Sequence, residues 1–519
     1  MVSRFSDIAK KYKERIALSY LDQEWTYGEL DAISDRAAAG LLALGVKKGT
    51  KVALWSNELP EAIFCYLGIL KTGGIAVMLN TSWTALEVQE RLEDSDAEIL
   101  IYEDGFRSVN FVEGAKNLKL CGLQKKIYIG RGGAESEYDL NRLYADGDAM
   151  PRDAVEKAKA AILPEDGDVI LFTSGSTSRP KAVLSTHYSR VHCALAQAEM
   201  VRADERDVFC IAIPMFHCFS MTGNMLAAWA IGAELALPES RKTDHLFTCV
   251  EKRGCTVLCA VPTLYSAMLA NKRRDSYDIS TLRTGVIGGS LYSETFFRRV
   301  CEELHMVLIS SLGQTEAVSA VTGAYYEDSL EARATTVGHF LKGTEGAIKD
   351  IETKEVLPLY QIGEICYRGF NTMKEYYRQP ELTAAVFDGE GYIHTGDLGF
   401  LDKDGNVHMT GRLKELIIRG GENIAPGEVE SAIMQDDRVA QVKVVGVPDA
   451  HYGEEVCAVI IPAEGQEIPP EEIREKVAGL LASYKVPRYV LYSQAFPLKG
   501  SGKVDTQAIE QWAAREILG

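Results

Sequence analysis

Residues 173–181 read Thr-Ser-Gly-Ser-Thr-Ser-Arg-Pro-Lys. They follow an apolar run, Asp168-Val-Ile-Leu-Phe172, that is typical of a strand, and they precede a helical pattern that begins near Tyr188. Hydroxyl groups, a glycine and a terminal lysine make a loop whose N–H, O–H and ammonium groups can surround phosphate oxygens. A solvated Ser/Thr-rich turn has the same composition, so these residues alone favour neither interpretation. The Walker A pattern is absent, which disfavours a P-loop kinase.

The clearest β-α-β unit lies between residues 283 and 310. Arg283-Thr-Gly-Val-Ile287 predicts a buried strand, residues 293–304 a helix, and Met306-Val-Leu-Ile-Ser310 the next strand, with parallel pairing and a right-handed crossover. Polar turns follow both strands, at residues 288–290 and 313–316. Ligands gather beyond the carboxyl ends of parallel strands, so we expect both turns to face one cleft.

The length and the texture of the chain predict two domains. At 519 residues the chain is too long for one ordinary core. The first four-fifths alternates apolar runs with helical patterns, which predicts an α/β fold: a large N-terminal domain, residues 1–411, of parallel or mixed sheets flanked by helices. A short stretch rich in Arg, Lys and Gly then precedes strand and helix patterns, and residues 412–519 are predicted to form a small α+β C-terminal domain.

Composition excludes several classes of protein. The net charge of −18 argues against nucleic-acid binding. The start of the chain lacks the apolar stretch of a secretory signal, and the most apolar segment, residues 225–237, is short and contains Glu234, so we expect a cytoplasmic protein without a membrane span. The eleven cysteines include no C-x-x-C pair, and Cys210, Cys255 and Cys259 lie in apolar runs. This usage favours reduced, buried thiols over a disulfide frame or a zinc site.

Five further motifs follow residues 173–181 along the chain. They are Leu312-Gly-Gln-Thr-Glu316, Tyr392-Ile-His-Thr-Gly-Asp397, Gly411-Arg-Leu-Lys-Glu-Leu-Ile417, Gly420-Gly-Glu-Asn-Ile424 and Gly500-Ser-Gly-Lys503. With these motifs in this order, nearly the whole chain resembles the adenylate-forming superfamily of acyl-CoA synthetases, adenylation domains and firefly-type luciferases. The resemblance implies that ATP activates a carboxylic acid as an acyl-adenylate, which then passes to a thiol. The implied cofactors are ATP, Mg²⁺ and coenzyme A.

The resemblance also implies roles for individual residues. Glu316 would hold the Mg²⁺ on the ATP phosphates, Thr315 would contact the α-phosphate, and Asp397 and Arg412 would bind the ribose. Lys503 would be the catalytic cation that stabilises charge building on the phosphate oxygens. The full nucleotide-binding set is Thr173, Ser174, Gly175, Ser176, Thr177, Lys181, Gly289, Ser290, Leu312, Gly313, Gln314, Thr315, Asp397 and Arg412. Taken singly, Glu316 could be a helix N-terminal carboxylate, Asp397 a turn residue and Lys503 a surface charge.

The small domain is implied to be mobile. It resembles one that rotates about a hinge at Lys414 between two poses. One pose inserts Lys503 for adenylation. The other brings in the residues of the thiol side, which are Gly420, Gly421, Glu422 and Asn423.

The segment Pro214–Met225 matches the acyl-pocket region of the family and contains no Asp, Glu, Lys or Arg. An amino-acid substrate would want a carboxylate there, so a hydrophobic aliphatic or aromatic acid is favoured. His217 would gate the pocket or orient the substrate carboxylate, although a histidine in an apolar run is commonly a core residue. The implied pocket residues are His217, Phe219, Met221, Gly288 and Gly289; each apolar one is equally compatible with plain core packing.

Several positions depart from the family pattern. Ser178 and Ala182 replace glycines, which would strain the loop if either needs a positive φ. Leu312 replaces an aromatic that stacks on adenine, and His339-Phe340 replaces Arg-Pro. Coenzyme A is the favoured acceptor. A carrier-protein acceptor, luciferase-type oxidation, a homodimer and a non-catalytic adenylate-binding protein on the same fold stay open.

Overall fold

Two large sheets frame the first four-fifths of the chain in the computed structural model. The described residues are 1–118, 122–133, 136, 138–173, 180–290, 292–420, 422–449, 451–498 and 504–518. The seven-stranded sheet has the spatial order β20 (Glu375–Tyr376), β10 (Lys181–Thr186), β9 (Gly167–Thr173), β4 (Ile75–Met78), β3 (Lys51–Trp55), β5 (Ile99–Tyr102) and β8 (Lys125–Tyr128). Its strands pair in parallel from β9 to β8, whereas β10 runs antiparallel to both of its neighbours.

The second sheet has nine strands. Its order is β17 (His339–Phe340), β16 (Thr322–Gly323), β15 (Val307–Leu312), β14 (Thr284–Ile287), β13 (Val257–Leu258), β11 (Val208–Cys210), β12 (Glu234–Leu237), β1 (Ile16–Tyr20) and β2 (Gln23–Thr26). The strands from β15 to β1 pair in parallel, and the strands at both edges are antiparallel. The predicted unit of residues 283–310 is confirmed, because β14 pairs in parallel with β15 on either side of α13 (Glu294–Glu303).

Alternation along the strands places apolar side chains on both faces of each sheet. On β15, Ile309 joins the largest core, which lies between the two sheets, while Leu308 joins a core on the outer face. The central core includes residues of α1 (Val2–Lys11), α2 (Tyr27–Ala43), α3 (Pro60–Lys71), α8 (His187–Met200) and α10 (Ala227–Ile231). The outer face of the nine-stranded sheet is covered by α11 (Thr243–Arg253), α12 (Pro262–Leu269) and α13. The result is a layered α/β domain, as the sequence predicts.

Two smaller sheets complete the molecule. The four-stranded antiparallel sheet consists of β18 (Glu345–Lys349), β19 (Gly363–Arg368), β21 (Ile393–Leu401) and β22 (Val407–Arg412). The C-terminal sheet contains β24 (Glu422–Ile424), β23 (Ile417–Arg419), β26 (Gly453–Pro462), β25 (Val439–Asp449) and β27 (Tyr489–Tyr492), with α16 (Pro426–Ile433), α17 (Pro470–Leu480) and α18 (Thr506–Leu518).

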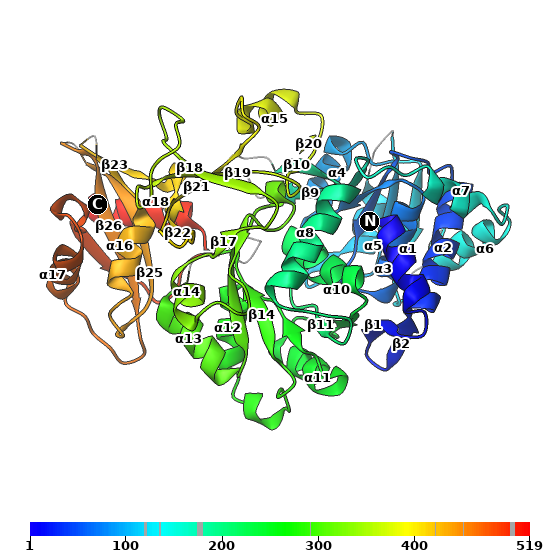
Figure 1. Cartoon of the computed structure of the whole chain (residues 1–519), viewed down its shortest axis with the longest axis horizontal. Helices are drawn as coiled ribbons and strands as arrows, with labels where there is room; N and C mark the ends of the chain where they lie inside the picture. The colour runs from blue at the N-terminus through cyan, green and yellow to red at the C-terminus, as the bar shows by residue number, and fades with distance from the viewer. Residues whose placement is uncertain are drawn as a thin grey trace.

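The C-terminal domain, orange to red in Figure 1, lies at one end of the long axis, and the four-stranded sheet lies between it and the two large sheets. A separate small α+β domain is therefore confirmed. Its boundary between residues 411 and 412 and its mobility stay predictions. Among the described residues, no helix combines the length and the apolar character that crossing a membrane requires.

Candidate active site

The two polar turns predicted to share a cleft lie next to each other. A side chain on Gly288, after β14, would come within 2.9 Å of the carbonyl oxygen of Ser311 near the end of β15. Gly289 has φ +89°, a conformation that favours glycine, and Ser290 is exposed. Beyond β15, a side chain on Gly313 would meet the carbonyl oxygen of Ser319 at 1.9 Å. Glycine is thus required at Gly313 by close backbone packing.

A short 3-10 helix, η3 (Thr315–Ala317), presents the two candidate catalytic residues of this turn. Thr315 and Glu316 are half-buried, as is Gln314 before them, and η3 packs beside β9. The helix ends at Val318 with φ +63°, where the amide N–H donates to the carbonyl oxygen of Thr315 at 2.9 Å. A β-branched residue in this conformation is strained by about 1–3 kcal/mol. Strain of this kind clusters at functional sites.

Tyr376 joins Glu316 to the end of the predicted phosphate loop. Its hydroxyl donates to Oε1 of Glu316 at 2.7 Å, and Nζ of Lys181 lies 4.7 Å from the centre of its ring. Burial, reinforced by the Glu316 carboxylate, raises the pKa of the Tyr376 hydroxyl, so this group stays a donor. Lys181 pairs with Thr173 across the antiparallel β9–β10 hairpin. The structure therefore brings Thr173, Lys181 and Glu316 to one edge of the sheets.

The turn of that hairpin lies outside the described residues. It contains Ser174, Gly175, Ser176 and Thr177 of the predicted set, together with Ser178. Ala182 is described, and it sits in extended strand β10 opposite Phe172. The concern that a side chain at Ala182 strains the loop does not apply, because an extended residue needs no positive φ.

Leu312 is buried at the end of β15. Only 7% of it is exposed, and it belongs to an apolar cluster with Val183, Tyr367 and Tyr376. Its side chain thus packs beneath the turn that carries Thr315 and Glu316. A direct contact with adenine stays a prediction.

Asp397 and Arg412, the two residues predicted to bind the ribose, lie together, and their contact with a ribose stays a prediction. Asp397 on β21 pairs with Arg412 on β22, and Nε of Arg412 lies 3.1 Å from Oδ1 of Asp397. Asp397 is 4% exposed, whereas the Arg412 side chain is 43% exposed. The two charges offset each other. A carboxylate is an acceptor-only group, which suits the two hydroxyls of a diol.

A buried glutamate holds the turn before Asp397. Oε1 of Glu364 accepts from the amide N–H of Gly396 at 3.0 Å, and its Oε2 lies 2.6 Å from Nδ1 of His394. Gly396 has φ +72°. Thr395 donates its hydroxyl to the carbonyl oxygen of Ile365 at 2.7 Å and accepts from the amide N–H of Asp397 at 3.0 Å. These bonds fix the backbone that presents Asp397.

The predicted acyl region forms an unusual helix. His217 precedes the short α9 (Cys218–Ser220), which continues into a π-helix over Met221–Leu226. His217 and Phe219 are half-buried, and Met221 is fully buried in the central core. π-Helical turns are rare and occur often at functional sites. Whether these three residues contact an acid stays a prediction.

Arg190 on α8 stabilises the start of this π-helix from inside the core. Its guanidinium donates to the carbonyl oxygen of Met221 at 3.4 Å, to Oγ1 of Thr222 at 3.3 Å and to Oδ2 of Asp168 at 3.0 Å. Burial alone would raise the pKa of Asp168, but Arg190 and the other positive groups around it hold that pKa below its ordinary value. The buried arginine is therefore charge-compensated.

The small domain contains the remaining candidates. Lys414 is exposed on the 3-10 helix η4 (Leu413–Glu415) between β22 and β23. Gly420 has φ +59°, its N–H donates to the carbonyl oxygen of Tyr452 at 2.8 Å, and Glu422 on β24 is exposed. Gly421, the side chain of Asn423 and Lys503 with its loop lie outside the described residues. Their roles stay predictions.

Three further residues of the candidate site have no motif in the local sequence: Tyr376, Glu364 and Arg190. Tyr376 reaches the site because β20 pairs with β10, about 190 residues earlier in the chain. Glu364 reaches the turn before Asp397 by pairing of β19 with β21. No local pattern signals such contacts. The available signal is a charged residue, Glu364 or Arg190, within a strand or helix pattern that also contains apolar residues.

Comparisons with known proteins identify the family. Residues 5–377 match the AMP-binding enzyme family, and residues 428–503 match the AMP-binding enzyme C-terminal domain. YngI of Bacillus subtilis (strain 168), which carries the name of an acyl-CoA synthetase, is 33% identical over 97% of this chain and 95% of its own length. Acyl-CoA ligase SID4 of Ajellomyces capsulatus is 31% identical over 97% of this chain and 89% of its own. The crystal structure of ATP-bound MatB from Rhodopseudomonas palustris superposes with a TM-score of 0.87 at 27% identity and covers 99% of both chains. The chain belongs to the AMP-binding enzyme family and is related throughout its length to acyl-CoA synthetases and ligases.

Proposed function

We propose that this protein is an ATP-dependent carboxylic acid:CoA ligase that activates a hydrophobic aliphatic or aromatic acid. The observation that carries the proposal is the joining of Thr173, Lys181 and Glu316 through Tyr376 at one edge of the sheets. A cation at the end of a hydroxyl-rich loop beside a carboxylate suits a nucleotide polyphosphate with its metal. Relatives named as acyl-CoA synthetases and ligases support the same activity.

In the proposed first step, a carboxylate oxygen of the acid attacks the α-phosphorus of ATP. The bond from that phosphorus to pyrophosphate breaks, and the acyl-adenylate forms. Lys181 and Lys503 would stabilise the negative charge on the phosphate oxygens, while Thr315 donates to the α-phosphate. Asp397 and Arg412 would hold the ribose.

The site has a fitting position for Mg²⁺. Mg²⁺ is bound through one or two carboxylates together with substrate phosphates. Glu316 offers one half-buried carboxylate, oriented by the Tyr376 hydroxyl. When bound, the ion would supply charge neutralisation on the ATP phosphates. In this chain, the hydroxyl of Tyr376 holds the Glu316 carboxylate in a fixed orientation.

In the proposed second step, the thiol of coenzyme A gives up its proton and its sulfur attacks the acyl carbon. The bond to AMP breaks, and an acyl-CoA thioester forms. Rotation of the small domain near Lys414 would exchange Lys503 for Gly420, Gly421, Glu422 and Asn423. The apolar character of Pro214–Met225 supports a hydrophobic acid, because a second charge on the substrate would find no partner in this segment.

A panel of aliphatic, aromatic and amino acids tests the proposal. Each acid is incubated with Mg·ATP, with and without coenzyme A, while pyrophosphate and acyl-CoA are measured. We expect pyrophosphate release with hydrophobic acids and acyl-CoA only when the thiol is present. Adenylate without acyl-CoA would redirect the acceptor to a carrier protein. ATP binding without turnover on any acid would contradict the catalytic proposal and support a non-catalytic adenylate-binding protein.

A further inference from the structure

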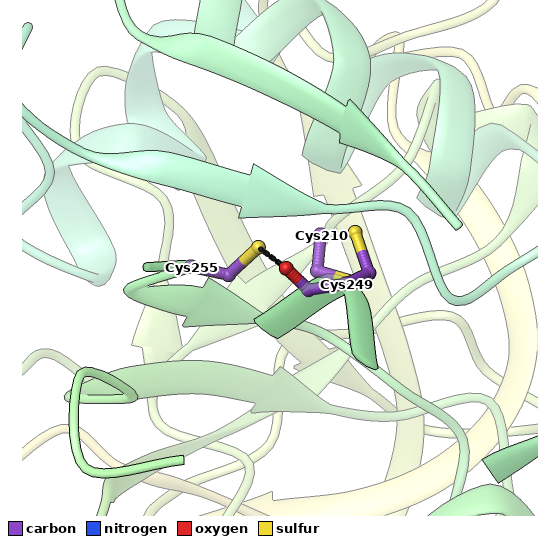
Figure 2. Close-up of side chains that lie close together, drawn as sticks. All are labelled: Cys210, Cys249 and Cys255. Carbon is purple, nitrogen blue, oxygen red and sulfur yellow. Dashed lines mark hydrogen bonds between the residues drawn. The ribbon is translucent and has the colours of Figure 1, made fainter. Parts of the chain in front are cut away.

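Three cysteine thiols from separate segments meet in the core on the outer face of the nine-stranded sheet. Cys210 ends β11, Cys249 lies in the last turns of α11, and Cys255 follows the glycine that ends this helix. Their three sulfur atoms all lie within 4.8 Å of one another. Figure 2 shows the three side chains gathered between helix and strand, with the Cys255 thiol donating to the carbonyl oxygen of Cys249 at 3.5 Å.

The sulfur spacing suits a metal ion. Zinc–thiolate bonds are about 2.3 Å long, so three sulfurs around one ion are about 4.0 Å apart in a plane. All three sulfur–sulfur separations are at most 4.8 Å, so a small side-chain adjustment can bring the sulfurs to this value. Three cysteines from separate segments thus present their sulfur atoms to one point in the core.

The electrostatic surroundings also favour a cation. The cluster lies at the C-terminal end of the eleven-residue α11, where the aligned peptide dipoles give a partial negative charge. A thiolate in an apolar core lacks water, and a bound cation would replace that solvation.

The carboxylate of Glu234 is already occupied by other partners. Glu234 on β12 binds Arg253 through both oxygens, at 2.9 and 3.1 Å, and accepts from Ser19 at 2.6 Å. Sulfur is therefore the ligand type that the described surroundings offer. Such a set selects soft ions with a filled d shell over Mg²⁺ or Ca²⁺.

We propose that Cys210, Cys249 and Cys255 bind one thiophilic d¹⁰ cation, Zn(II) or Cu(I), which ties α11 to β11. Binding releases up to three thiol protons to solvent and transfers no electron. The ion stabilises the large domain, and it acts apart from the acid-activating site. This inference is independent of the proposed function.

Metal content per chain tests the proposal. The reduced full-length protein is loaded with Zn(II), or with Cu(I) under anaerobic conditions, and then desalted with a weak chelator. We expect the protein to retain a single ion per chain for one of the two metals. The retained metal identifies the ion that the three cysteines bind. The midpoint of thermal unfolding should rise on loading. Cys249→Ser and Cys249→Ala should both lose the ion and this rise.

Cys259→Ser is the matched control. Cys259 is a buried thiol of the same region that belongs to the opposite core, so this variant should keep the ion. Loss of two hydrogens with a crosslink between two of the three cysteines would overturn the metal site in favour of a disulfide. The metal site would also be overturned if the wild-type protein retained neither Zn(II) nor Cu(I), or if both Cys249 variants retained as much metal as the wild type.

Discussion

Tyr376→Phe isolates one hydroxyl at the centre of the candidate site. The substitution keeps the ring 4.7 Å from Nζ of Lys181 and removes only the donor that lies 2.7 Å from Glu316 Oε1. A hydrogen bond to a charged group contributes about 1.5–3 kcal/mol. We therefore expect the free energy of unfolding to fall by about this amount. We also expect a higher Mg²⁺ concentration for half-maximal pyrophosphate exchange, since Glu316 loses its fixed orientation.

The control for this variant is Tyr144→Phe. The Tyr144 hydroxyl is buried and finds no hydrogen-bond partner among the described residues, so its removal should cost little. Urea denaturation and Mg²⁺ titration of exchange are measured on both variants and the wild type. If Tyr376→Phe matches wild type in both measurements, the hydrogen bond to Glu316 does not organise the site.

Three further predictions address other parts of the molecule. Lys503→Ala should lower acid-dependent pyrophosphate exchange by orders of magnitude while sparing thioester formation from supplied acyl-adenylate; equal loss in both half-reactions would contradict two poses. Gly313→Ala should lower the thermal midpoint of unfolding and abolish pyrophosphate exchange, because the added carbon would meet the Ser319 carbonyl oxygen at 1.9 Å. Its control is Gly479→Ala on α17, where the added carbon meets open space and should stabilise the protein by about 0.5–1 kcal/mol. Similar midpoints for the two variants would count against the close packing at Gly313. Burial lowers the pKa of His187 from 6.5 to about 4, so the unfolded chain binds a proton that the folded chain does not. The free energy of unfolding should therefore fall by about 3 kcal/mol as the pH drops from 6.5 towards 4. In His187→Gln the free energy of unfolding should depend less steeply on pH over this range, and an unchanged dependence would assign the loss to other groups.

Local patterns predicted the parallel unit well. Residues 283–287 end in the apolar pair Val286-Ile287, residues 306–309 are apolar, and a helical pattern lies between them. The elements β14, α13 and β15 occupy the predicted positions within two residues at each end. In the C-terminal domain, the sequence predicts strands at residues 442–447 and 455–461 and a helix at residues 470–481. These elements are present as β25, β26 and α17. In each case periodicity and turn residues agree with the final fold.

Contacts between distant segments were beyond reach of such patterns. The sequence placed Glu316 and Lys181 correctly on loop ends, but Tyr376 between them depends on the pairing of β20 with β10. The cysteines illustrate the same limit. Spacing argued against a metal site, yet folding brings Cys210 to Cys249 and Cys255 through the packing of α11 on the sheet. Pairing over such separations is set by tertiary packing, which a single sequence does not display.

The most direct test of the ligase proposal follows the adenylate itself. Excess enzyme is mixed with Mg·ATP labelled at the α-phosphate and with an acid from the panel that releases pyrophosphate. The reaction is quenched before and after coenzyme A is added. We predict that label accumulates as acyl-AMP and is released as AMP when the thiol is added, with an equal amount of acyl-CoA. Formation of acyl-CoA with ADP and phosphate, or label that never enters an acyl-AMP, would contradict this prediction.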